Sequence, residues 1–297
     1  MNGDAALLLL ADSRLPAGGH AHSGGVEEAV RRGAVTGAGD LARFLRGRLA
    51  TAGLVTAALA AAACELAAVD GGGSADREFR GAGDPGAPPA DDAADGVPLW
   101  RRLDAEADAR TASPAQREAA RTQGRLLLRT ARRMWPSAAL DALARAVPEG
   151  PHHPVALGAA AASAGCTPRQ AALAAAYTSV TGPATAAVRL LGLDPVTVHR
   201  LLADLAPALE DAAHVACASL DDAVPADDEP DGCEAGHHQG HHQGRHPGQQ
   251  PGQPPGRHPG RHLAWQARWH ALPGHSAPAL DLLAEGHLTN PMKLFVS

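Results

Sequence analysis

The amino-acid sequence predicts an all-α protein: a single compact helical domain of roughly eight to ten helices with two disordered insertions. Helix start signals recur along the chain, and no stretch shows the period-2 alternation of β-branched and aromatic residues that is typical of strands. Aromatic residues make up 3% of the chain although hydrophobic residues make up 45%, so the core must consist of Ala, Leu and Val, which favours closely packed helices. The 297 residues suffice for one large domain, so residues 1–297 are taken as one unit.

The first long apolar segment is bounded by a capping residue and a run of glycines. Asp40 is expected to cap a helix over residues 41–69, which Gly71–Gly73 would end. The glycines open a stretch, residues 70–98, that is rich in Gly, Pro and Asp. Such a composition buries too little apolar surface to order itself, so we expect a disordered insertion here.

Three further helix starts are marked by a capping residue followed by proline. Ser113 opens a Ser-Pro-x-Gln sequence and Thr167 opens a Thr-Pro-x-Gln sequence. Both fit a capping box with proline in the first helical turn. Asp194 also precedes a proline and predicts another helix, in which Pro207 is expected to cause a kink.

The last quarter of the chain begins with a second low-complexity stretch, residues 221–262. It has an acidic opening followed by Gly, Gln, Pro and His, and we expect it to be a disordered insertion. Trp265 and Trp269 follow, four residues apart, and should share one side of a short helical turn. Ser276 is expected to cap a last helix that ends near His287, before an uncapped tail.

Charge and cysteine content limit the classes of partner and compartment. A net charge of −6 provides no cationic field for phosphate backbones, so nucleic acid is not an expected partner. Residues 49–69 are apolar but mostly Ala with Glu65 inside, so no membrane span is expected.

The four cysteines have no metal-site spacing and indicate reduced thiols in a cytoplasmic protein. They are Cys64, Cys166, Cys217 and Cys233.

The segment Asp12–Glu27 is a glycine-rich stretch with several polar side chains, and three interpretations of it stay open. A hydrolase site would need a serine nucleophile, but the segment has no G-x-S-x-G elbow. His20 and His22 alternate in sequence and can face one metal ion, although two ligands make an incomplete site. The third interpretation is a structural loop that joins two helices and presents a surface to a partner.

Paired carboxylates give little support for an enzyme. Glu27 and Glu28 are adjacent in sequence, as are Asp221 and Asp222, and neighbours on a helix point to different faces. We therefore interpret them as solvated charges. The chain also lacks a G-x-x-x-x-G-K-[ST] loop, so it is not expected to bind GTP in the P-loop manner. No catalytic site is predicted.

A histidine tract near residue 240 repeats the unit His-His-Gln-Gly. Neutral imidazoles bind borderline metals such as nickel and zinc, and flexible glycine spacing lets several close on one ion. The alternative is a polar low-complexity linker that binds metal only incidentally. If the tract is functional, the protein could be a free-standing nickel or zinc store or metallochaperone. The candidate ligands are His237, His238, His241, His242 and His246.

Five sequence blocks, in order along the chain, resemble the UreF family of urease accessory proteins. The first block, from Leu15 to Glu27, reads L-P-A-G-G-H-A-H-S-G-G-V-E. The others are Gln123–Arg129, His152–Gly158, Tyr177–Leu191 and Pro278–Ser297. The chain departs from the family pattern at Lys293, where the family usually has arginine. A planar guanidinium, which can form two parallel hydrogen bonds, is thus replaced by a single ammonium group.

The resemblance implies a helical, dimer-forming protein without a required cofactor. It would join UreD, also called UreH, and the GTPase UreG in a complex that delivers nickel to apo-urease. In this family the C-terminal tail helps to engage UreD, which makes Lys293, Leu294, Phe295 and Ser297 candidate contacts.

Three further residues in the family-like blocks are candidate partner contacts: Arg125, Tyr177 and Arg189. A trans-acting arginine for a GTPase is one role for either arginine. The more ordinary role is to satisfy helix ends or a buried carboxylate. Tyr177, the only tyrosine, likewise fits a core position with a hydrogen-bonded hydroxyl.

Overall fold

The computed structural model describes residues 3–12, 14–79, 96–221, 265 and 268–296. All regular structure in this part of the chain is helical, with no strand, which confirms the all-α prediction. Twelve α-helices are present in these residues, a few more than expected because some predicted segments divide. They are α1 (Gly3–Ala11), α2 (Val26–Arg31), α3 (Ala38–Arg48), α4 (Leu54–Phe79), α5 (Gly96–Ala109), α6 (Pro114–Met134), α7 (Ala138–Ala146), α8 (His153–Ser163), α9 (Pro168–Leu191), α10 (Pro195–Asp204), α11 (Ala206–Asp221) and α13 (Pro278–Leu288).

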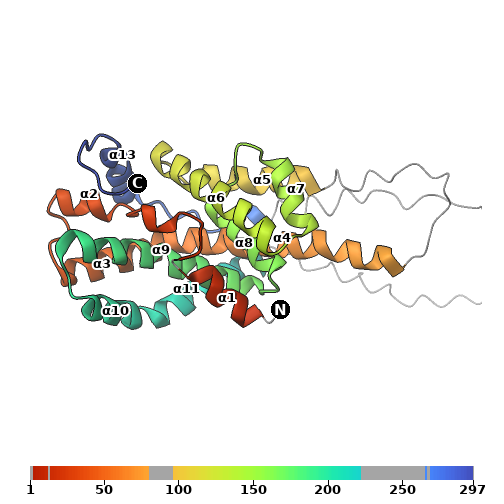
Figure 1. Cartoon of the computed structure of the whole chain (residues 1–297), viewed down its shortest axis with the longest axis horizontal. Helices are drawn as coiled ribbons and strands as arrows, with labels where there is room; N and C mark the ends of the chain where they lie inside the picture. The colour runs from red at the N-terminus through yellow and green to blue at the C-terminus, as the bar shows by residue number, and fades with distance from the viewer. Residues whose placement is uncertain (1–2, 13, 80–95, 222–264, 266–267, 297) are drawn as a thin grey trace, which may run out of the picture.

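Helices α4, α8 and α9 form the centre of the molecule. α11 packs against α4 and α9, while α6 and α7 cover α8 (Figure 1). The helical stretch Ala38–Asp70, which includes α3 and most of α4, is long and apolar enough to cross a membrane. Its most apolar window is 72% buried inside the protein, as expected for the central helix of a helical core.

Alanine and glycine let the central helices approach closely. Ala156, Ala159 and Ala160 of α8 are fully buried, so small side chains lie in the core around this helix. Gly158 faces α4, where an added Cβ would collide with the Ala60 carbonyl oxygen. The contact therefore brings helix backbones together rather than interlocking large side chains, as the low aromatic content predicts.

The helix starts marked by proline are confirmed. Ser113 Oγ accepts a hydrogen bond from the Gln116 backbone N at 3.1 Å. Thr167 forms a complete capping box with Gln170. Asp194 accepts bonds from two backbone N–H groups in the first turn of α10.

Three other boundary predictions were wrong. α3 begins after Gly37, and Asp40 instead accepts a bond from the Thr36 backbone N at 3.0 Å. Pro207 does not kink a continuous helix, because α10 ends and α11 begins just before it. The proline therefore lies in the first turn of α11, where a backbone N–H has no partner within the helix and its loss costs little. The residue before the last helix is Ala277 rather than Ser276.

Gly71–Gly73 do not end the central helix, because α4 continues to Phe79. Glycine lowers helix propensity by about 1 kcal/mol but ends a helix only where the backbone leaves the helical conformation. α5 already starts at Gly96, and Trp100 Nε1 donates to Asp70 Oδ2 at 3.0 Å. Of the predicted insertion 70–98, residues 80–95 lie outside the described residues.

Most of the second predicted insertion, residues 222–262, also lies outside the described part. The chain returns beside the point where it left, since Arg268 Nε donates to the Leu220 carbonyl at 3.0 Å. The pairing of Trp265 with Trp269 is confirmed, with ring centroids 5.8 Å apart. Trp269 is fully buried, so this short segment is anchored in the core.

Candidate functional site

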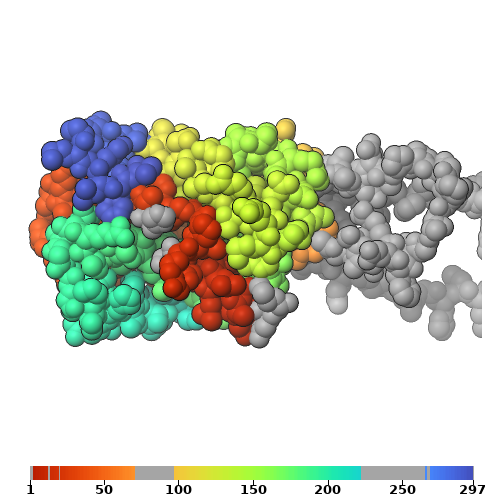
Figure 2. Space-filling view, in the orientation of Figure 1, coloured from red at the N-terminus to blue at the C-terminus, as the bar shows by residue number. Residues whose placement is uncertain are grey.

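The C-terminal tail after α13 is held by its main chain against α2 and the loop that precedes α2. The Glu27 carboxylate on α2 accepts bonds from the backbone N of Leu294 at 2.6 Å and of Phe295 at 3.2 Å. The Val296 N donates to the Ala21 carbonyl at 2.7 Å. Figure 2 shows the C-terminal segment at the surface, next to the N-terminal part of the chain.

Within the described tail, Phe295 points into the core and the side chains on either side of it are exposed. Phe295 is 7% exposed, whereas Met292, Leu294 and Val296 are 85%, 75% and 57% exposed. Lys293 is also exposed, and Ser297 lies outside the described residues. The backbone contacts and Phe295 fix the segment, and the remaining apolar side chains stay accessible to another protein.

His287, on the last turn of α13, completes the attachment. It is 1% exposed, and its Nε2 lies 3.1 Å from the Phe295 carbonyl oxygen. A carbonyl only accepts, so this nitrogen carries a proton. Nδ1 lies 3.5 Å from Glu27 Oε2. We call Glu27 and His287 the tail clamp.

Glu28, the next residue of α2, is fully buried. Arg31 Nε donates to it at 2.6 Å and Arg32 Nε at 2.7 Å. The hydrogen bonds from Arg31, followed by those from Arg32, outweigh burial and lower the pKa of Glu28 to about 2. The interpretation of Glu27 and Glu28 as solvated charges was therefore wrong. α13 and the tail cover α2, and this long-range packing has no local signal in the sequence.

The loop over Asp12–Glu27 is held by a partly buried arginine, Arg48. Gly24 and Gly25 adopt φ angles of 58° and 88°, which favour glycine. Arg48 Nη1 donates to the Gly24 carbonyl at 2.9 Å, and its Nε donates to the Ser179 carbonyl at 2.8 Å. Burial lowers the pKa of Arg48 to about 10.

The Arg48 contact compensates for a proline inside α9. Pro183 has no N–H, so the carbonyl four residues earlier, that of Ser179, lacks its usual partner in the helix. Arg48 occupies that acceptor and ties the glycine loop to α9. These contacts favour the structural interpretation of the loop.

Of the two loop histidines, only the side chain of His22 is described, and it belongs to no set of three possible metal ligands among the described residues. His22 is 8% exposed and lies near His153, whose pKa is lowered to about 4 by burial and by the neighbouring His22. The His20 side chain lies outside what the structure describes. The candidate ligands in the tract, His237, His238, His241, His242 and His246, also lie outside the described residues.

Within the described residues, the one set of three groups close enough to hold a metal is Asp104, Asp108 and His152. Arg121 already pairs with Asp104 at 2.9 Å and with Asp108 at 2.6 Å. His152 Nε2 lies 2.8 Å from the Asp108 carboxylate. A cation would have to displace the guanidinium, so the set is better explained as a network that joins α5, α6 and α8.

The remaining candidate contacts lie on two helices. Arg125 on α6 donates to the Glu149 carbonyl at 2.8 Å, consistent with its ordinary role at a loop. Tyr177 is 37% exposed, so the expected core position was wrong. Arg189 is exposed in the last turn of the same helix, α9, roughly 18 Å further along its axis. Both α9 side chains are accessible to a partner.

Comparison with known proteins identifies related chains. Residues 35–206 match the model of the UreF family. The urease accessory protein UreF of Mycobacterium sp. (strain JLS) is 48% identical over 210 residues, which cover 71% of this chain and 83% of that protein. UreF of Mycolicibacterium vanbaalenii is 44% identical over 222 residues, covering 75% and 89% of the two chains. UreF of Mycobacterium tuberculosis (strain H37Rv) is 42% identical over 220 residues, covering 73% and 87%.

Proposed function

The chain belongs to the UreF family, and on that premise we propose that it joins UreD (UreH) and the GTPase UreG in a complex that assists nickel insertion into apo-urease. In this role it supplies docking surfaces and no catalytic group. GTP hydrolysis belongs to the partner, since this chain has no P-loop sequence. We further propose that it acts as a homodimer in the cytoplasm.

The clamped tail is the observation that carries this proposal. Glu27 binds the tail through backbone N–H groups, so the side chains of Leu294 and Val296 remain exposed. Exposed apolar side chains on a pre-positioned segment bind a partner at a lower entropic cost than a free tail would. We assign this surface to UreD. Tyr177 and Arg189, both exposed on α9, are the candidate contacts for the other partners.

A pull-down with purified UreD tests the tail. The double substitution Leu294→Asp/Val296→Asp places two charges on the proposed contact and should weaken binding at least about tenfold. Val196→Asp is the matched control, because Val196 is 75% exposed like Leu294 but lies on α10. Equal binding by the double variant and the wild type would reject the tail as the UreD contact.

Nickel binding by the histidine tract is a separate proposal, based on the tract's repeat. The tract would raise the local nickel concentration during transfer. Deleting residues 233–262 should slow urease activation at limiting nickel and leave it unchanged when nickel is in excess. Equal activation at every nickel concentration would reject this role.

A further inference from the structure

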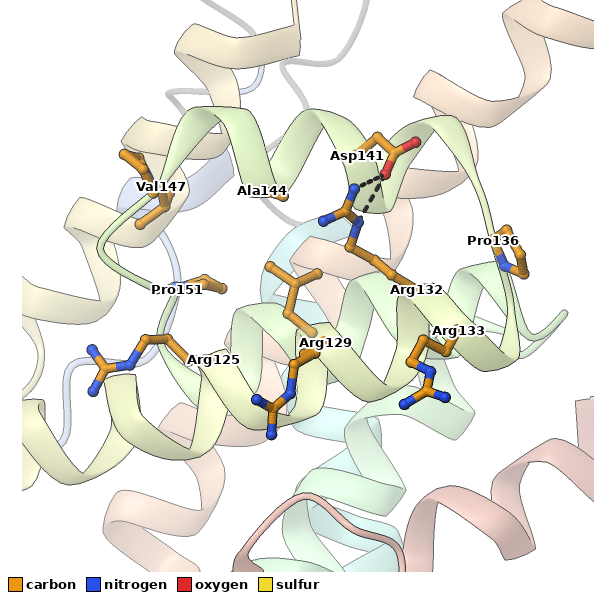
Figure 3. Close-up of a pocket in the computed structure, with 12 residues that line it drawn as sticks. Arg125, Arg129, Arg132, Arg133, Pro136, Asp141, Ala144, Val147 and Pro151 are labelled. Atoms are coloured by element: carbon orange, nitrogen blue, oxygen red, sulfur yellow. Dashed lines mark hydrogen bonds and ion pairs between the residues drawn. The ribbon is translucent and has the colours of Figure 1, made fainter.

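A groove between α6 and α7 carries a concentration of arginines in a chain of net negative charge. The groove is open to solvent and has a volume of about 690 Å³. Figure 3 shows Arg125, Arg129 and Arg133 extending along one side of α6, while Arg132 points across to Asp141 on α7. The register of α6 places Arg125, Arg129 and Arg133 on one face, because they are four residues apart.

Two of these arginines have no internal counter-charge in the described residues. Arg132 Nη2 pairs with Asp141 at 2.7 Å, and Arg125 donates to the Glu149 carbonyl and to Thr122. Arg129 and Arg133 are exposed, and the described part of the chain shows no ion pair for either of them. Like charges four residues apart repel each other on a helix, so this pair favours binding of an external anion.

The floor of the groove is apolar, which restricts the kind of anion. Leu128 and Val147 are 6% and 3% exposed, and Ala144 and Pro151 also line the groove. A phosphate group alone would leave this floor uncovered. A polypeptide that combines carboxylates with apolar side chains would pair the carboxylates with the arginines of α6 and pack the apolar side chains on the floor of the groove.

The spacing of the free arginines specifies the arrangement of those carboxylates. Arg129 and Arg133 are separated by about 6 Å along the axis of α6. Acidic residues at positions i and i+4 of a helix lying alongside α6 have the same separation. We propose that this groove binds an amphipathic acidic helix of a partner protein, with two carboxylates at i and i+4 facing Arg129 and Arg133. This inference does not depend on the role in urease maturation.

Fluorescence anisotropy on the full chain tests the proposal with synthetic probes. The first probe is a labelled alanine–leucine helix with glutamates at i and i+4 on one face. The second has the same composition with glutamates distributed over all faces. The first peptide should bind more tightly, and its binding should weaken as salt increases. Equal binding of the two peptides would overturn the proposal.

Charge reversal identifies the residues involved. Arg129→Glu/Arg133→Glu should weaken binding of the first peptide by about tenfold or more, and a lysine version of the peptide should bind the variant better than it binds the wild type. Arg46→Glu/Arg200→Glu is the matched control, with the same charge change at exposed positions on α3 and α10. If the charge-reversal variant fails to fold, Arg129→Gln/Arg133→Gln replaces it in the same assay and should also weaken binding of the first peptide. Loss of binding in the control alone, or displacement of the peptide by millimolar inorganic phosphate at constant ionic strength, would contradict an acidic-helix site.

Discussion

Replacing Glu27 by glutamine should release the C-terminal tail without unfolding the helical body. The two carboxylate oxygens accept bonds from the backbone N of Leu294 at 2.6 Å and of Phe295 at 3.2 Å. Glutamine keeps one acceptor oxygen, but its amide nitrogen only donates, so one backbone N–H loses its partner. A hydrogen bond to a charged group contributes about 1.5–3 kcal/mol, and a buried unpaired N–H costs about 1–3 kcal/mol.

Because these contributions overlap, the free energy of tail opening should fall by about 2–4 kcal/mol. The open population then rises roughly 30-fold to 700-fold, since each 1.4 kcal/mol corresponds to a factor of ten. Burial of Phe295 opposes complete release, so part of the tail contact should persist in the variant.

Native-state hydrogen exchange measures this effect directly. The amides of Leu294 and Phe295 should lose protection in Glu27→Gln, while the amides of α8 should keep theirs. Glu285→Gln is the matched control: Glu285, on α13, accepts bonds from Ser113 Oγ and from the Ala115 N rather than from the tail. Unchanged protection at Leu294, or an equal loss in the control, would refute the clamp.

Three further substitutions test other parts of the structure. Gly158→Ala should destabilise the fold by at least about 2 kcal/mol in urea unfolding, because the new Cβ meets the α4 backbone. Gly182→Ala is the control and should destabilise the fold much less, because its Cβ would have no contact closer than 3.7 Å. Arg48→Met should lower the free energy of unfolding by about 2–4 kcal/mol, because two partly buried carbonyls lose a charged donor; an unchanged value would exclude that role. Glu28 has a folded-state pKa of about 2, below its ordinary value of 4.5, so its contribution is complete above pH 4.5 and is lost as the pH falls toward 2. The stability difference between wild type and Glu28→Gln should shrink over that interval in acid, and a constant difference would contradict the assignment.

Features that depend on a few neighbouring residues could be predicted from the sequence. Ser113, Thr167 and Asp194 satisfy backbone N–H groups within the following turn, and the structure confirms all three. The all-α class followed from the same local signals. Helix ends were harder, because α4 passes through three glycines without leaving the helical conformation.

The tail clamp could not be predicted, because its parts come from opposite ends of the chain. Glu27 was interpreted from the sequence as a solvated charge, but α13 and the tail bury it. Arg48 likewise gave no signal, since its role depends on the acceptor that Pro183 leaves free in a distant helix. Charges whose partners lie far away in sequence need the tertiary structure before they can be assigned.

The proposed docking role can be tested most directly by reconstituting urease activation from apo-urease, UreD, UreG, GTP and nickel. With this chain added, urease activity should rise well above the level reached without it. Leu294→Asp/Val296→Asp should return activity toward that lower level, and Val196→Asp should not. Equal urease activity with and without the chain would contradict the account.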